Sequence, residues 1–185
     1  MENELQLFVA IIGCKPNGRL TEQHDIFFGV GKSLKDLTNQ MEQFWPEAVG
    51  NMHLDAWRTV SSVDGHSIEV VKKEKSTGNL KLFFINLGGY RPGEFEEYHY
   101  KMLVVADSLA DAIKISKQTA FYKHAGFKGA PSHIDDKYGV DVDDTYLVED
   151  ILPSPFKEKY SLRITPSTDS SEDKLNIGYF DLKKL

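Results

Sequence analysis

The sequence predicts an α+β protein with mainly antiparallel sheets, formed by an internal duplication of a β-β-α-β-β unit with an extra C-terminal strand pair. Three observations predict this class. Apolar runs rich in β-branched and aromatic residues alternate with turn-forming segments, which is typical of strands. Helical spacing of apolar residues occurs clearly in only two places. The two halves of the chain also resemble each other at a constant offset of 75 residues.

The two halves align without a gap over forty positions. Residues 5–44 and 80–119 share twelve identical residues, and after a five-residue insertion in the second half the alignment resumes with His53 opposite His133. We therefore predict a repeated organisation, in which the two repeats pack as one pseudo-twofold domain. The predicted parts are a first repeat unit over 1–75, a second repeat unit over 76–152 and a C-terminal strand pair over 153–185.

Each half begins with two predicted strands. The runs LQLFVAII (5–12) and LKLFFINL (80–87) are apolar, and each is followed by a loop that contains Gly and Pro. Second strands are predicted at 25–31 and 100–106, where aromatic and β-branched residues continue.

One helix is then predicted in each half. Ser33 and Ser108 suit the N-cap position, because each is followed three residues later by an Asp that favours the positive end of the helix dipole. Pro46 should end the first helix, and Gly126 should cap the C-terminal end of the second.

Further strands complete the halves and the C-terminal region. Segment 58–71 predicts a hairpin with Asp64–Gly65 as its tight turn, and segment 138–151 is a weaker version of it without the glycine. Two more strands are predicted at 160–166 and 176–182, and we expect them to pair with each other.

Composition restricts the partners and the location. The chain has 185 residues, a net charge of −6, 41% apolar residues and 27% charged residues, as in ordinary globular proteins. No nucleic-acid partner is expected, because neutralising phosphates requires clustered Lys and Arg. No membrane partner is expected either, since neither a signal peptide nor a long apolar stretch is recognisable. With Cys14 as its one cysteine, the chain is expected to be soluble and cytoplasmic.

Two kinds of His and carboxylate pair stand out because they occur in both halves. Residues i and i+2 of an extended strand point to the same face, so each Glu-x-His or His-x-Asp pair offers an imidazole and a carboxylate together. The eight residues are Glu22, His24, His53, Asp55, Glu97, His99, His133 and Asp135. We interpret them as candidate ligand-binding residues for a small molecule or a metal ion. Alternatively, each pair only fastens a glycine loop to a strand through hydrogen bonds.

The second half, including PSHIDDKYG (131–139), resembles the bacterial family DUF1543, a domain of unknown function, and the first half resembles it less regularly. The resemblance extends over nearly all of residues 5–151. Similar proteins carry one or two copies of the domain per chain, so the resemblance implies the two-copy organisation. It implies no reaction, cofactor or catalytic residue.

Three classes of function remain open from the sequence. The first is a non-enzymatic small-ligand-binding module with a cleft between the two repeats, because pockets favour such interfaces. The second is a structural or interaction protein that forms a homodimer through its C-terminal strands. The third is a metal-assisted or acid–base enzyme that uses the His and carboxylate pairs. Cys14 is interpreted as a small buried thiol rather than a nucleophile.

Overall fold

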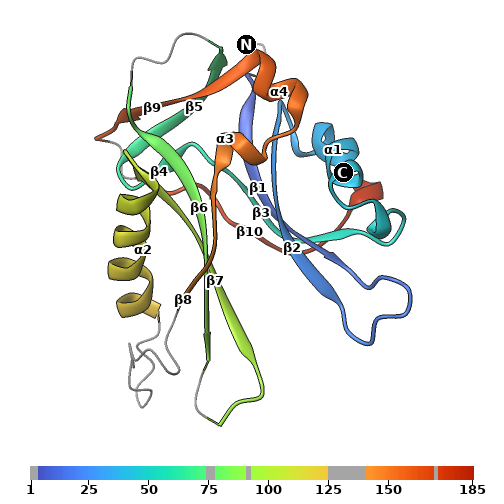
Figure 1. The fold of residues 1–185 in the computed structure, drawn as a ribbon. Helices are drawn as coiled ribbons and strands as arrows, with labels where there is room; N and C mark the ends of the chain where they lie inside the picture. The colour runs from blue at the N-terminus through green and yellow to red at the C-terminus, as the bar shows by residue number, and fades with distance from the viewer. Residues whose placement is uncertain (1–3, 74–77, 91–92, 125–140, 169–170) are drawn as a thin grey trace. The chain divides into compact units, whose positions relative to one another are not determined.

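A computed structural model describes residues 4–73, 78–90, 93–124, 141–168 and 171–185 of the chain. The chain forms two compact units, which are coloured by sequence position in Figure 1. The first unit joins Met1–Ser76 to Ile151–Leu185, and the second is Thr77–Asp150. The C-terminal segment is therefore part of the unit that the N-terminal segment begins.

A four-stranded antiparallel sheet in the order β10-β3-β1-β2 dominates the first unit. Its strands are β1 (Gln6–Cys14), β2 (Gln23–Gly31), β3 (His53–Thr59) and β10 (Asn176–Asp181). β1 is a central strand with neighbours on both sides. Most of its residues are buried, and burial of both faces of a strand favours a continuous apolar run over an alternating one.

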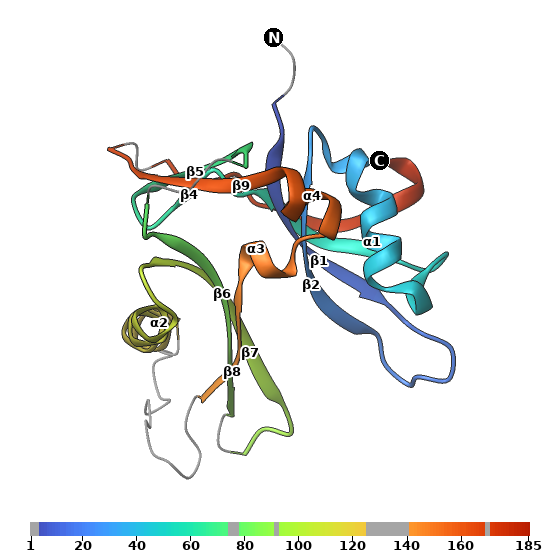
Figure 2. The ribbon, with the colours of Figure 1, turned by 45° about the horizontal axis from the view of Figure 1, so that its top comes forward.

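Short helices cover one face of this sheet, as Figures 1 and 2 both show. They are η1 (Leu34–Leu37), α1 (Thr38–Phe44) and η2 (Pro46–Ala48). The Asp36 carboxylate accepts hydrogen bonds from the backbone N–H groups of Ser33 and Lys32 at 2.9 and 3.0 Å, which fixes the predicted helix start. The buried core comprises Phe8, Ala10, Ile12, Cys14, Phe27, Leu34, Leu37, Met41, Ala48, Met52 and Leu54.

A smaller antiparallel sheet in the order β4-β5-β9 also belongs to the first unit. Its strands are β4 (Ser62–Val63), β5 (His66–Lys72) and β9 (Tyr160–Pro166), while α4 (Ser154–Lys159) precedes β9 and η3 (Leu182–Lys184) follows β10. Asp64 and Gly65 form the turn between β4 and β5 with φ values of 50° and 73°. Two positive φ values are the mark of a type I′ turn, so the predicted Asp-Gly turn is confirmed.

The second unit consists of a three-stranded antiparallel sheet in the order β7-β6-β8 and one long helix. Its elements are β6 (Lys81–Tyr90), β7 (Glu97–Ala106), α2 (Leu109–His124), β8 (Asp141–Leu147) and α3 (Val148–Ile151). The last residue of α3, Ile151, is also the first residue of the C-terminal segment that belongs to the first unit. The Ser108 hydroxyl binds the Asp111 carboxylate at 2.5 Å and accepts a hydrogen bond from the Asp111 N–H, as expected for a cap. The core comprises Phe83, Ile85, Leu87, Val104, Ala106 and Ala112.

The strand ladders of the two units agree at the offset of 75 residues. Gly13 pairs with His24, and Gly88 pairs with His99. A β-bulge also interrupts the pairing of β1 with β3 and that of β6 with β8. It lies between Ile11 and Ile12 in β1 and between Asn86 and Leu87 in β6, which are equivalent positions at this offset. These correspondences fit the predicted repeat, whose origin by duplication remains a prediction.

The predicted α+β class with mainly antiparallel sheets is confirmed, and two details differ. Where a second hairpin was predicted over 138–151, β8 is followed by α3, because this segment lacks the Asp-Gly turn. The two C-terminal strands form where predicted but do not pair with each other: β9 pairs with β5, and β10 pairs with β3. The predicted cap Gly126 lies outside the described residues.

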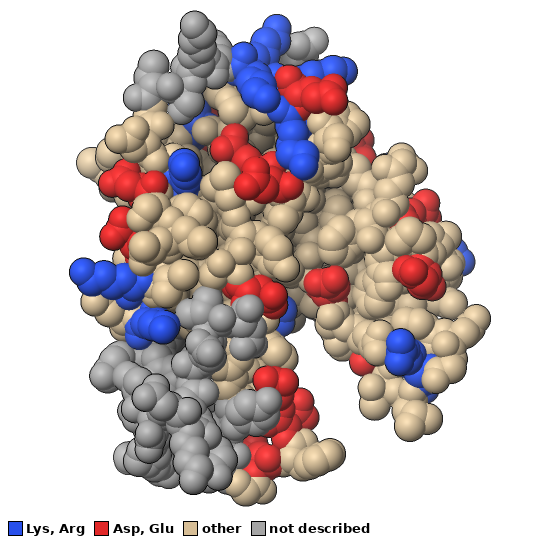
Figure 3. Space-filling view, viewed as in Figure 1, with Lys and Arg blue, Asp and Glu red and all other residues tan. Residues whose placement is uncertain are grey.

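The charged side chains are mixed over the face drawn in Figure 3, where Lys and Arg stand among Asp and Glu. None of the helices in the described ranges has the length and apolarity needed to span a membrane.

Candidate functional site

Gly13 lies between two histidines in the sheet of the first unit. In the ladder of β1 it pairs with His24 on β2 and with His53 on β3. Neighbouring strands are about 4.8 Å apart, so two imidazoles on alternate strands can meet most easily above a residue without a side chain. A Cβ at Gly13 would lie 2.6 Å from Asp55 Oδ2 and even closer to His53 Nε2. The glycine therefore provides the space in which these polar side chains gather.

Four side chains of the first unit meet above Gly13. His24 Nε2 lies 3.2 Å from Asp55 Oδ2 and 3.7 Å from Glu22 Oε2. His53 Nε2 lies 3.1 Å from Glu22 Oε1 and 3.5 Å from Asp55 Oδ1. Each imidazole thus faces both carboxylates, and we call these four residues the His-carboxylate cluster.

The His-carboxylate cluster is open on one side and buried on the other. The side chains of Glu22 and His24 are each 44% exposed, whereas that of His53 is 6% exposed. Tyr179 from β10 stacks on the His53 ring, with ring centroids 4.4 Å apart and planes inclined by 26°. Asp55 Oδ2 is buried and has no hydrogen-bond partner among the described residues. The cluster therefore combines accessible donors with an unsatisfied carboxylate oxygen.

The contacts within the cluster are long for an ion pair. Charge-assisted N–H···O bonds are about 2.7–2.9 Å long, and all four distances here exceed that range. In the described part of the chain, no group of three or more His, Cys, Asp or Glu side chains is arranged so that it could hold a metal ion. The four side chains are thus neither joined by strong hydrogen bonds nor closed around a shared point.

The second unit brings together the Glu-x-His pair of its predicted set. His99 Nε2 lies 3.8 Å from Glu97 Oε2. Asn86 Nδ2 lies 3.3 Å from His99 Nδ1 and also 3.3 Å from Asp144 Oδ2, to which it donates a hydrogen bond. The side-chain amide of Asn86 therefore lies beside this imidazole.

The other two residues of the second set, His133 and Asp135, lie outside the described residues. The strand ladder nevertheless identifies the position equivalent to His53. His53 is the residue of β3 that pairs with the first glycine, and Asp141 is the residue of β8 that pairs with the equivalent glycine of β6. In backbone register, Asp141 therefore stands opposite the glycine of β6 as His53 stands opposite Gly13.

A hollow of about 440 Å³ lies beside the cluster in the first unit. Glu22 and His53 belong to both the cluster and the lining of the hollow, and Tyr179 forms another part of the lining. Lys15 and Arg19 add two exposed cations, neither of which forms an ion pair with a described residue. The lining of the hollow therefore contains both two cationic side chains and two members of the His-carboxylate cluster.

Sequence reasoning missed Lys15, Arg19 and Tyr179. The first two lie in a loop whose Gly and Pro content predicts a turn and nothing about ligands. Tyr179 reaches His53 only because β10 pairs with β3, and no local pattern in the sequence indicates that pairing.

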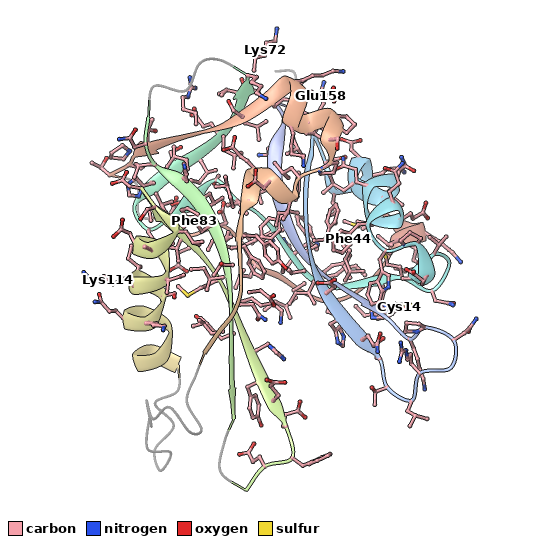
Figure 4. All side chains as sticks on the ribbon, viewed as in Figure 1. Cys14, Phe44, Lys72, Phe83, Lys114 and Glu158 are labelled. Carbon is pink, nitrogen blue, oxygen red and sulfur yellow. The ribbon has the colours of Figure 1, made fainter. Side chains whose placement is uncertain are left out.

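Cys14 lies on the opposite face of β1 from Gly13, since successive residues of a strand alternate. Its side chain, labelled in Figure 4, is buried in the core, with Sγ 4.0 Å from the carbonyl oxygen of Ala48 in η2. Burial raises the pKa of the Cys14 thiol, and the negative charge of Glu22 raises it further. A buried thiol that keeps its proton is a poor nucleophile, which agrees with the sequence interpretation.

Residues 19–70, in the first half of the chain, match the model of the family described as Domain of Unknown Function (DUF1543), which confirms the resemblance to that family for this segment. All four residues of the His-carboxylate cluster lie within this match. The chain is also similar to the crystal structure of the protein Il1583 from Idiomarina loihiensis, with a TM-score of 0.64 and 22% sequence identity. That similarity covers 97% of this chain and 98% of the other, and at this identity it concerns the fold alone. The curated proteins contain no match to the chain.

Proposed function

We propose that the first unit is a non-enzymatic small-ligand-binding module, and that its ligand is a small organic acid or phosphate held in the hollow beside the His-carboxylate cluster. The observation that carries this proposal is the presence of Lys15 and Arg19 in the lining without acidic partners among the described residues. A guanidinium binds a carboxylate or phosphate through two parallel hydrogen bonds, and an ammonium adds a compact positive charge.

The remaining lining supports the same class of ligand. Two asparagine side chains can donate and accept hydrogen bonds, and the stacked rings of His53 and Tyr179 offer a flat surface to the body of a ligand. The carboxylate of Glu22 repels an anion at the cluster side of the hollow. The acidic group of the ligand is therefore placed at the side of Lys15 and Arg19.

The test is a thermal-shift panel on the purified protein with small carboxylic acids, phosphates and their neutral amide or alcohol analogues. A ligand at about 100 times its Kd adds about 2.7 kcal/mol of stability, which corresponds to a rise in Tm of roughly 5–10 °C for a chain of this size. The anionic compounds of at least one class should give such a rise, and their neutral analogues should not.

Two matched variants test whether the rise in Tm comes from anion binding at Arg19. Arg19→Gln should abolish the rise, whereas Lys35→Gln, which removes an exposed cation on η1, should retain it. Equal stabilisation by the neutral analogues, or an undiminished rise in Arg19→Gln, would contradict the proposal.

A second candidate function is self-association through β10, which forms an edge of the larger sheet. Leu175, Ile177 and Tyr179 are 62%, 76% and 72% exposed, which is unusual for apolar side chains along an edge strand. The irregular register between Ile177 and Phe180 bends this edge, and bent edges pair less readily, so this function ranks second. A sedimentation experiment in which the chain is a dimer and Ile177→Lys a monomer would support it, and a monomeric parent chain would exclude it.

A further inference from the structure

Opposite charges line the hollow of the first unit without neutralising each other. Lys15 and Arg19 contribute two cations to the lining, and Glu22 contributes a carboxylate. Among the described residues, neither cation forms an ion pair with that carboxylate. The hollow therefore presents both a positive and a negative group to a ligand.

The separation of these charges has a cause in the β1–β2 hairpin. The ladder of β1 and β2 ends with Cys14 opposite Gln23, so Lys15 and Glu22 are the next residues on the two sides of the loop. Instead of pairing with Lys15, the Glu22 carboxylate lies 3.1 Å from His53 Nε2 and 3.7 Å from His24 Nε2. The two imidazoles thus position Glu22 on the side of the His-carboxylate cluster.

The side of the hollow at His53 suits a positively charged group. Glu22 contacts the His53 imidazole, and Tyr179 stacks on the same ring with centroids 4.4 Å apart, so both lining residues lie at this side. An ammonium group forms charge-assisted hydrogen bonds with a carboxylate and is also attracted to the face of an aromatic ring. A carboxylate can accept more hydrogen bonds than two imidazoles supply, and the Glu22 side chain is 44% exposed.

Asp55 increases the negative charge at this side. Its carboxylate lies 3.2 Å from His24 Nε2 and 3.5 Å from His53 Nε2, and no Lys or Arg among the described residues pairs with it. A second acidic group on the ligand would be repelled here, and an apolar group would remove water from Glu22 without replacing its hydrogen bonds. A cationic group on the ligand avoids both costs.

We propose that the ligand of the hollow is a small amino acid or amino phosphate, which carries an ammonium group as well as its acidic group. Its carboxylate or phosphate binds Lys15 and Arg19, and its ammonium group binds Glu22 beside the Tyr179 ring. This inference rests on the proposed anion-binding function and adds the second charge of the ligand.

The test compares pairs of compounds that differ in the amino group. Isothermal titration of the full-length protein gives the Kd of β-alanine against propionate, and of phosphoethanolamine against ethyl phosphate. In at least one pair, the amino compound should bind at least about fivefold more tightly, because a charge-assisted hydrogen bond in a hollow exceeds the small gain of a fully exposed ion pair.

A substitution then assigns this preference to one residue. Glu22→Gln keeps the shape of the side chain and removes its charge. It should reduce the preference to less than about twofold, and it should leave the affinity for the compound without an amino group unchanged or higher, because the repulsion of the anion is removed. Glu4→Gln is the control, since Glu4 is an exposed acid at the opposite end of β1 from Lys15, and it should preserve the preference.

The possible failures are distinguishable. If both compounds of a pair bind with equal affinity, the anion site stands and the amino acid or amino phosphate proposal is wrong. If no compound of either pair binds, the proposed anion-binding function fails together with this inference. An undiminished preference in Glu22→Gln also overturns the inference, and the comparison of compounds in the unchanged protein decides the question if this variant does not fold.

Discussion

At the scale of single residues, Gly13 determines whether the cluster can form. An added Cβ would meet His53 Nε2 and Asp55 Oδ2, and the buried His53 ring cannot move out of its way. We expect Gly13→Ala to lower the free energy of unfolding by about 1–3 kcal/mol, as overpacking does, and to weaken ligand binding. The measurement is urea unfolding.

Gly78→Ala is the control for this change, because a Cβ at Gly78 would meet nothing within 4 Å. Its stability should stay within about 0.5 kcal/mol of the parent chain. Equal effects of the two substitutions would show that close packing above Gly13 is not the reason for the glycine.

Cys14 should react slowly in the folded protein. Burial and then the charge of Glu22 raise the pKa of this thiol, so the native state keeps the proton when the unfolded chain has lost it. Stability should therefore fall as the pH rises above the ordinary thiol pKa of about 8.5, and Cys14→Ala should lack this part of the decline. Thiol titration with a disulfide reagent, with and without urea, measures the accessibility, and rapid labelling without urea would contradict the burial.

At the scale of elements, the C-terminal segment is attached to the corner between β3 and β4 by one carboxylate. Asp173, with a side chain only 4% exposed, accepts hydrogen bonds from Ser61 N and Ser61 Oγ at 2.8 and 2.6 Å, and from Ser62 N at 3.2 Å. No local pattern indicates this role, because Asp173 lies in a polar stretch that predicts a loop.

Asp173→Ala should cost about 1–3 kcal/mol, because it removes several hydrogen bonds to one charged carboxylate. Glu172→Ala removes the neighbouring exposed acid and should change the stability by less than about 0.5 kcal/mol. Thermal unfolding of both variants is sufficient, and a small effect of Asp173→Ala would mean that water replaces the carboxylate.

The elements that were predictable are those specified by local patterns. The apolar runs located β1 and β6, the Ser and Asp pairs located both helix starts, and Asp64–Gly65 located a turn. The partners of β9 and β10 were not predictable, since pairing between strands so far apart in the chain leaves no local signal. For the same reason the four residues of the cluster were identified, but Tyr179 was not.

At the scale of the whole molecule, the first unit depends on both ends of the chain. Ending the chain after residue 156 removes β9 and β10, and it uncovers core contacts of Phe180, Leu182 and Leu185. We expect the first unit to lose at least about 3 kcal/mol, because several apolar side chains lose their burial. Both tryptophans, Trp45 and Trp57, belong to this unit, so tryptophan fluorescence in urea reports its unfolding separately. An unchanged midpoint would contradict the assignment of the C-terminal segment to the first unit.

The central claim is that the His-carboxylate cluster is a binding site rather than a fastening for the β1–β2 loop, and the most direct test is the unfolding free energy of ligand-free His24→Ala. His24 is 44% exposed, and its contacts to Glu22 and Asp55 are longer than strong hydrogen bonds. The account predicts a change of less than about 0.5 kcal/mol, as for other exposed pairs. A loss of about 2 kcal/mol or more without any ligand present would contradict it, because the cluster would then be a structural fastening.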